Sequence, residues 1–243
     1  MKLVHIGLGG MGKTVQTIAQ ERGHQSVGEI EVGDEIDTSS LGNCDLAIEC
    51  TVPKACVGNI RKVLKAGKDC LVITTGWYDE MDEVREMVEK SGVRFLYASN
   101  FSIGVNLYFR VVEEAAKLIN LADEYDVWGH EIHHKNKVDS PSGTAKTLET
   151  ILLQNIDRKK RVVEEKLDRK IEDDELHFSS VRGGMVNFGH TIGFDSSSDC
   201  IKIEHFARNR DGYALGAIKC AEWLLQQKPG FYTMDDFLKS VFK

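Results

Sequence analysis

The chain has 243 residues, enough for one large domain or two of moderate size. Its net charge of −7 disfavours a general nucleic-acid binder, because such proteins are usually basic toward phosphate. The six cysteines form no CxxC pair, and no apolar run approaches the ~20 residues that span a bilayer. We expect a cytoplasmic globular protein without a signal peptide, with free thiols and with Cys50 and Cys70 inside buried strands.

Short apolar strands alternate with amphipathic helices through the first hundred residues. We expect strands at 2–6, 26–30, 46–50, 70–74 and 93–98, and helices at 11–22, 54–66 and 79–91. Strict alternation of this kind predicts parallel βαβ units with helices on both faces of a sheet. Ligands bind such sheets at the carboxyl ends of the strands, so the segments directly after each strand are the candidate binding residues.

The first such segment is the GxGxxG run Gly7-Leu8-Gly9-Gly10-Met11-Gly12, between a strand and a helix. Gly7 permits a tight turn, Gly9 lets the backbone approach a pyrophosphate, and Gly12 lets the helix pack closely on the strand. The helix N-terminus adds unpaired N–H groups and a partial positive charge. The run predicts a site for NADH or NADPH.

Glu31 stands at the end of the second expected strand. A carboxylate there can accept hydrogen bonds from the adenine ribose hydroxyls. Because it would repel a 2′-phosphate, Glu31 slightly favours NADH over NADPH. Glu29 and Asp34 are alternative candidates for the same role.

Two further strand ends carry polar residues. Thr74-Thr75-Gly76 brings two hydroxyls and a glycine to a position where the nicotinamide ring and the substrate would lie. Ala98-Ser99-Asn100-Phe101 follows the fifth strand, and the Asn100 amide is suited to fixing the nicotinamide carboxamide. Each segment is either a ligand contact or an ordinary polar turn.

The second half changes pattern. We expect helices at 105–120, 142–156 and 213–226, and strands at 125–133, 177–182, 185–194 and 200–207. The last three strands lack intervening helices, which predicts an antiparallel or mixed sheet. We therefore expect an α/β protein with a discontinuous Rossmann-like dinucleotide-binding domain, residues 1–104 and 211–243, and an α+β substrate domain, residues 105–210.

The densest polar run of the chain extends from Glu131 to Thr144. An expected strand delivers His133 and His134, whose side chains should point to opposite faces. For that reason they do not easily bind one ion, and we expect no metal site. The structural alternative is a solvated basic loop ahead of a helix.

A helix that begins at Gly143 and Thr144 follows this loop, with Ser142 as its candidate N-cap. Backbone N–H groups at its positive end would form a carboxylate site. Lys137 would add a cation to that site.

The run His133-His134-Lys135-Asn136-Lys137-Val138-Asp139-Ser140-Pro141-Ser142-Gly143-Thr144-Ala145 resembles the HHxxKxDxPSGTA motif of the dihydrodipicolinate reductases. The resemblance covers nearly the whole chain. Glu49-Cys50 stands where the family usually has Asp-Phe, and Ser99 where it often has proline.

The resemblance implies transfer of a hydride from the nicotinamide to C4 of a cyclic unsaturated dicarboxylate, giving tetrahydrodipicolinate for lysine and diaminopimelate synthesis. It makes His133 the acid/base candidate and Lys137 the proton donor. It assigns the substrate carboxylates to His134, Gly143 and Thr144, and places Thr75 near the reacting carbon. It also implies a homotetramer joined through the sheets of the second domain.

Two other functions stay open. A related oxidoreductase acting on an amino acid or a cyclic imine would share the cofactor half. A non-catalytic sensor of dinucleotide or dicarboxylate would have no need of a proton donor, and His133 and Lys137 argue against it. The family pattern also includes four residues that are either structural or functional: Arg182, His190, His205 and Arg210.

Overall fold

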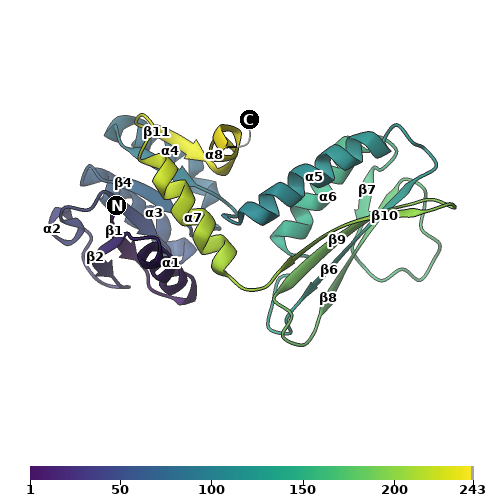
Figure 1. Ribbon diagram of the computed structural model, residues 1–243, viewed down its shortest axis with the longest axis horizontal. Coiled ribbons are helices and arrows are strands. Elements are labelled where there is room, and N and C mark those ends of the chain that lie inside the picture. Colours follow the sequence, from purple (N-terminus) through teal and green to yellow (C-terminus); the bar gives the residue numbers. More distant parts are fainter. Residues whose placement is uncertain (242–243) are drawn as a thin grey trace. The chain divides into compact units, whose positions relative to one another are not determined.

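The computed structural model describes residues 1–241 and divides the chain into two compact units (Figure 1). Unit 1 combines Met1–Ile103 with the segment from Arg210 onward, and unit 2 is Gly104–Asn209. Within the described residues, no helix has both the length and the apolar character needed to cross a bilayer.

Unit 1 is built on a six-stranded sheet in the order β11-β5-β4-β3-β1-β2, parallel throughout. Its strands are β1 (Lys2–Ile6), β2 (Gln25–Ile30), β3 (Leu46–Glu49), β4 (Asp69–Val72), β5 (Arg94–Tyr97) and β11 (Gly230–Thr233). The chain leaves β1 toward β2 on one side and later returns to β3 on the other. This reversal is the point at which ligands of open α/β sheets bind.

Helices cover both faces of this sheet. They are α1 (Gly10–Glu21), α2 (Thr38–Leu41), α3 (Pro53–Lys65), α4 (Met81–Ser91), α7 (Asp211–Leu224) and α8 (Met234–Val241), with a short 3₁₀ turn at Tyr78–Glu80. Alternate residues of one strand point to opposite faces of the sheet and belong to different hydrophobic clusters. Val4 packs with α3 and α4, and Leu3 packs with α1 and α7. Burial on both faces explains the nearly continuous apolar strands and confirms the expected parallel α/β fold.

Helix α7 belongs to unit 1. It packs against α1 and shares a core cluster with it. A side chain at Gly216 would begin 1.8 Å from the carbonyl oxygen of Phe101, so α7 meets the turn after β5 through its backbone.

Several sequence predictions need correction in unit 1. The strand expected to contain Cys50 ends at Glu49, and Cys50 is half-buried rather than inside a strand. The strand expected to reach Thr74 ends at Val72. Helices α2 and α8 and strand β11 were not predicted, because each is short; β11 has only four residues.

Unit 2 holds a five-stranded mixed sheet in the order β10-β9-β6-β8-β7. Its strands are β6 (Asp126–His133), β7 (Arg161–Val163), β8 (Glu175–Arg182), β9 (Phe188–Asp195) and β10 (Cys200–Ala207). Strand β6 runs parallel to β8 and antiparallel to β9, which confirms the expected mixed sheet. Helices α5 (Ile103–Ile119) and α6 (Gly143–Asn155) pack on one face, where one core cluster joins them to the sheet (Figure 1).

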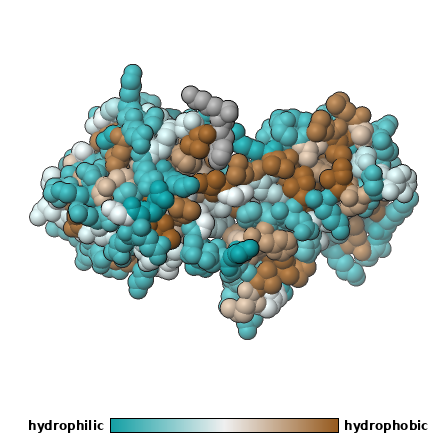
Figure 2. Space-filling view, viewed as in Figure 1, coloured by the Kyte–Doolittle hydropathy of each residue, from teal (hydrophilic) through white to brown (hydrophobic). Residues whose placement is uncertain are grey.

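The other face of this sheet is only partly covered within unit 2. Two aromatic rings lie flat across it, since a side chain at Gly193 would begin 2.2 Å from the Trp128 ring and one at Gly189 2.2 Å from the Phe206 ring. Trp128 is half-buried, and Phe206 and Val181 are exposed. Apolar residues also reach the surface on α5 and the turn that follows it (Figure 2): Leu107, Val111, Leu118 and Leu121.

Because Gly216 leaves no space for a β-carbon, we expect Gly216→Ala to lower the free energy of unfolding by roughly 1–3 kcal/mol. Gly58→Ala is the matched control: Gly58 lies in α3, and nothing stands within 4 Å of the added carbon. Replacing a glycine in a helix interior by alanine should raise the free energy of unfolding by up to ~1 kcal/mol. Urea unfolding curves measure both, and equal midpoints for wild type and Gly216→Ala would contradict the close contact.

Candidate active site

The glycine run of unit 1 has the geometry of a phosphate-binding turn. Gly7 has φ +87°, and a side chain there would begin 2.5 Å from the carbonyl oxygen of Cys50. A side chain at Gly12 would begin 2.1 Å from the Gly7 carbonyl oxygen, so α1 can approach β1 only with glycine at this position. Gly9 is the N-cap of α1 and offers its first N–H groups no side-chain partner. The arrangement fits a bound pyrophosphate.

Three further features in and around the run favour an anion. The first turn of α1 has no acidic residue. The Arg210 guanidinium lies close above the loop, with Nη1 3.4 Å from where a Gly10 side chain would begin. The space around Gly9 is open to at least 4 Å. The sequence left Arg210 without a role, and its position next to Gly10 makes it a candidate phosphate contact.

Three acidic residues compete for the ribose role at the end of β2. The Glu29 carboxylate accepts a hydrogen bond from Gln16 Nε2 at 2.7 Å. The Asp34 carboxylate accepts one from the backbone N–H of Glu31 at 2.8 Å. The Glu31 side chain is exposed directly after the strand. All three side chains are exposed, and among the described contacts only the Glu31 carboxylate accepts no hydrogen bond.

The two hydroxyls of the Thr74-Thr75-Gly76 turn differ in role: one belongs to a structural hydrogen bond and the other is accessible. Thr74 is only 8% exposed, and its Oγ1 accepts a hydrogen bond from the Thr51 backbone N–H at 2.8 Å, joining the turns after β3 and β4. Its carbonyl oxygen accepts one from Trp77 Nε1 at 2.8 Å. Thr75 is exposed. Thr74 therefore shapes the turn, and Thr75 is the residue accessible to a ligand.

The segment after β5 divides in a similar way. Phe101 is 3% exposed and packs in the core that α1 and α7 share, and Ala98 is buried there too. Ser99 is exposed and Asn100 is half-buried. Asn100 Oδ1 accepts a hydrogen bond from the Ser102 backbone N–H at 2.8 Å. Of the four residues expected to contact the cofactor, Ser99 and Asn100 have accessible side chains.

The departure at Glu49-Cys50 also has a structural consequence. Glu49 is fully buried at the end of β3. Its carboxylate accepts hydrogen bonds from Thr51 Oγ1, from Asn59 Nδ2 at 3.2 Å and from Cys56 Sγ at 3.3 Å. Glu49 therefore stabilises the turn after β3, which lies beside the glycine run.

In unit 2, strand β6 places Glu131 and His133 on the face covered by helices, because residues two apart on a strand share a face. Glu131 is fully buried and His133 is 4% exposed. His134 lies just beyond the strand and is half-buried. The histidine pair thus divides as expected, with one ring inside and one nearer the surface.

One oxygen of the Glu131 carboxylate is held from three sides. Oε1 accepts hydrogen bonds from the Ser142 backbone N–H at 3.0 Å, from Ser180 Oγ at 2.8 Å and from Arg182 Nη2 at 2.7 Å. These donors come from the N-terminus of α6 and from β8. The carboxylate therefore ties two neighbouring elements to β6.

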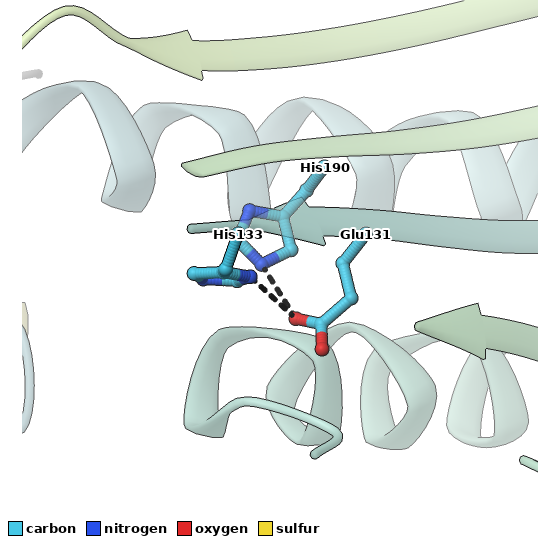
Figure 3. Close-up of side chains that lie close together, drawn as sticks. All are labelled: Glu131, His133 and His190. Atoms are coloured by element: carbon cyan, nitrogen blue, oxygen red, sulfur yellow. Dashed lines mark ion pairs between the residues drawn. The ribbon is translucent and has the colours of Figure 1, made fainter. Parts of the chain in front are cut away.

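The other oxygen faces two histidines (Figure 3). Oε2 lies 3.5 Å from His133 Nδ1 and 3.3 Å from His190 Nε2. His190 belongs to β9 and is buried, and its Nε2 also lies 3.2 Å from Ser142 Oγ. Sequence reasoning left Glu131 without a role and that of His190 open. The usable signal was the spacing of Glu131, two residues before His133 on one strand.

Burial governs the charge states in this cluster. It lowers the pKa of His133 to about 4, against the attraction of Glu131, so the ring is neutral near pH 7. Burial alone would raise the pKa of Glu131, but hydrogen bonds from His190, Ser142, Arg182 and Ser180 hold it well below its usual range. Glu131 is therefore an anion beside neutral His133.

Glu131, His133 and His190 are ligand types that bind metals, and their donor atoms lie within 4.8 Å of one another. The Glu131 carboxylate thus joins the two histidines as a third candidate ligand. The Arg182 guanidinium already neutralises this carboxylate, and a metal ion would add a second positive charge beside it. The arrangement suits a hydrogen-bonded cluster better than a metal site.

The loop between β6 and α6 is fixed at both ends. Ser142 caps α6 as predicted, since its Oγ accepts a hydrogen bond from the Ala145 backbone N–H at 3.2 Å. Arg182 Nη2 also donates to the Asp139 carbonyl oxygen at 2.7 Å. Lys137 Nζ lies 2.6 and 2.8 Å from the two oxygens of the Asp139 carboxylate. Gly143, at the start of α6, is exposed.

The protonation states predict acid sensitivity. His133 is neutral when folded down to about pH 4, but its unfolded form takes up a proton near 6.5, so acidification through this window favours unfolding. The loss should reach roughly 3 kcal/mol at most. Glu131 adds a further loss below its ordinary pKa of 4.5, because protonation removes its ionic contacts.

Urea unfolding of wild type and His133→Gln between pH 7.5 and 4.5 measures this effect. The variant should show a shallower decline, but not a flat one, because burial also lowers the pKa of His5 and His205. Parallel declines in the two proteins would show that His133 is not the responsible group.

Comparisons with known proteins agree on one family. Residues 1–101 match the model "Dihydrodipicolinate reductase, N-terminus" and residues 104–238 match "Dihydrodipicolinate reductase, C-terminus". The 4-hydroxy-tetrahydrodipicolinate reductase of Christiangramia forsetii is 39% identical over the full length of both chains. That of Archaeoglobus fulgidus is 37% identical over 88% of this chain and 82% of its own.

A solved structure, the dipicolinate-bound dihydrodipicolinate reductase from Paenisporosarcina sp. TG-14, has the same fold. It covers all of both chains with a TM-score of 0.74 at 19% identity. The family models together span both units, and the full-length relatives carry the same name. The resemblance seen in the histidine-lysine motif is confirmed: this chain belongs to the dihydrodipicolinate reductase family.

Proposed function

We propose that this chain reduces 4-hydroxy-tetrahydrodipicolinate to tetrahydrodipicolinate with NAD(P)H, a step in lysine and diaminopimelate biosynthesis. Family membership over the full length carries the proposal. Two local features support it: an open glycine turn at the start of α1, and a histidine-lysine loop ahead of α6.

The dinucleotide would lie at the carboxyl edge of the unit 1 sheet, where the glycine turn supplies N–H groups and Arg210 a cation. Thr75, Ser99 and Asn100 are the accessible residues at the neighbouring strand ends. The exposed Glu31 slightly favours NADH, since its charge would oppose a 2′-phosphate.

The substrate would be a small dicarboxylate, in line with the dipicolinate bound to the Paenisporosarcina reductase. The N-terminus of α6 suits one carboxylate, because Ser142 caps the helix and leaves Gly143 exposed at its positive end. Thr144 follows Gly143 in α6, and Thr144 and His134 are both half-buried. Lys137 would hold the second carboxylate or donate the proton.

When bound, NAD(P)H supplies the hydride, and the chain's residues must provide charge and a proton. The low pKa of His133 leaves its ring neutral at pH 7, so the ring can accept a hydrogen bond at one nitrogen but is neither a charged acid nor a strong base. Lys137 is then the better proton donor, and its ion pair with Asp139 sets its position. A cation there also stabilises negative charge that builds on the reduced substrate.

We also propose a cytoplasmic homotetramer. The open face of the unit 2 sheet supports it, because Trp128 and Phe206 lie flat over glycines and leave an even, partly apolar surface. Such a face suits packing against a second sheet. Sedimentation of the wild type, compared with Phe206→Lys, tests this assembly.

Lys137→Ala should lower kcat by about 10²–10⁴-fold, the usual contribution of a positioned general acid. NADH binding should not change, since the glycine run lies in the other unit. Lys135→Ala is the control, as an exposed lysine of the same loop. The assay uses freshly made aldol product, and near-normal turnover in Lys137→Ala would refute the donor role.

The same assay separates the alternatives in the wild type. Faster turnover of an amino acid or a cyclic imine would indicate a related oxidoreductase. Tight binding of pyridine-2,6-dicarboxylate without NADH oxidation would indicate a sensor.

Glu31→Gln should move cofactor preference toward NADPH. Removing one charge beside a 2′-phosphate should improve NADPH affinity on the order of 10-fold, about 1.4 kcal/mol. Glu29→Gln serves as the control, because that carboxylate is already bound to Gln16. Titrations of both cofactors with the dicarboxylate analogue present measure the ratio, and an equal shift in both variants would exclude a specific role for Glu31.

A further inference from the structure

We propose that Glu131 is a positioning residue that orients both candidate proton-transfer groups of unit 2, His133 directly and Lys137 through Arg182. The proposal extends the proposed function by assigning a role to a residue that contacts neither substrate nor cofactor.

The anchoring of the carboxylate makes this role possible. Three donors fix Oε1 at 2.7–3.0 Å, and two of them, Ser142 N–H and Arg182 Nη2, belong to segments that border the loop from His134 to Pro141. Oε2 keeps no such donor and faces the two imidazoles. One side of the carboxylate therefore fixes its plane, and the other is available to the histidines.

The contact with His133 determines which ring nitrogen carries the proton. Because Oε2 lies 3.5 Å from Nδ1, the anion favours the proton on Nδ1 in the neutral ring. Nε2 then becomes the nitrogen that accepts hydrogen bonds. His190 approaches the same oxygen from β9 at 3.3 Å, and Phe188 stacks on His133 with ring centres 6.0 Å apart. The ring is thereby limited in rotation.

The contact with Lys137 is indirect. Arg182 Nη2 donates both to Glu131 Oε1 at 2.7 Å and to the Asp139 carbonyl oxygen at 2.7 Å. The Asp139 carboxylate in turn holds Lys137 Nζ. Loss of the Glu131 charge would free the guanidinium, and with it the segment that carries the lysine.

A purely structural carboxylate in the same sheet provides the matched control. Glu175 on β8 is also buried and accepts hydrogen bonds from Arg161 and Arg169 and from a backbone N–H. It lies opposite Arg161 in the strand register, and among the described contacts it meets neither His133 nor His190. Glu131→Gln and Glu175→Gln thus remove equivalent charges, one beside His133 and one away from it.

The experiment compares these two variants in the full-length protein. Ring ¹⁵N shifts of His133 should report Nδ1–H in wild type and in Glu175→Gln, and a tautomer mixture in Glu131→Gln. The kcat of Glu131→Gln should fall at least 10-fold below that of Glu175→Gln, with the KM for NADH unchanged. Pyridine-2,6-dicarboxylate binding should weaken in the same variant.

A wild-type His133 that carries its proton on Nε2 would overturn the proposal, as would equal kcat and equal tautomer signals in the two variants. If Glu131→Gln does not fold, Ser180→Ala removes one of the bonds that fix Oε1 and should produce a smaller change in the same direction; no change would count against the proposal. Absence of turnover in the wild type itself would contradict the proposed function instead, and the ring signals would still test the role of Glu131.

Discussion

The buried carboxylate of Glu131 is the interaction on which the arrangement of unit 2 depends. A buried anion is tolerated only when it is compensated, and here hydrogen bonds come from β8 and from the cap of α6, while histidines on β6 and β9 lie within 3.5 Å of the second oxygen. Each of these groups is therefore fixed in position by its interaction with the Glu131 carboxylate. The histidine-lysine loop lies between two of these donors and inherits their positions.

The site in unit 1 depends on a different constraint, the absence of a side chain at two glycines of the first turn. Gly7 and Gly12 bring the backbone of β1, its turn and α1 within contact distance, and the first N–H groups of α1 are left without a side-chain cap. The buried Glu49 and the Thr51–Thr74 hydrogen bond then fix the adjacent turns. The result is an open, positively polarised edge, whereas the site in unit 2 is closely packed and dense in charges.

Local pattern in the sequence was sufficient for most helices and strands and for the Ser142 cap. Burial alternates in these elements with the period of the structure, so β1, α1, β6 and α6 lie within two residues of their predicted bounds. The spacing of Glu131 and His133 was a local signal, but the partners of Glu131 on other elements were beyond such reasoning. Ser180 and His190 face Glu131 only through strand register, and Arg182 is 51 residues away in the chain. No local pattern in one sequence specifies that pairing.

The lack of a local signal for distant packing also explains why some predicted cofactor contacts in unit 1 are buried. Phe101 and Thr74 follow strands and were expected to contact a ligand, but their burial depends on α7 and on the turn after β3. An isolated polar or aromatic residue after a strand does not reveal which way its side chain will turn. Thr75, Ser99 and Asn100 retained accessible positions beside them.

Because α7 packs on α1 and β11 pairs with β5, the first unit is interrupted by the second along the chain. During synthesis, about a hundred residues of unit 2 must leave the ribosome before α7 can cover its side of the β1–β5 sheet. The part of that face which α7 covers would stay exposed in that interval, although α1 is already present, and unit 2 can meanwhile fold. Unit 1 is thus the first to begin synthesis and the last to complete its fold.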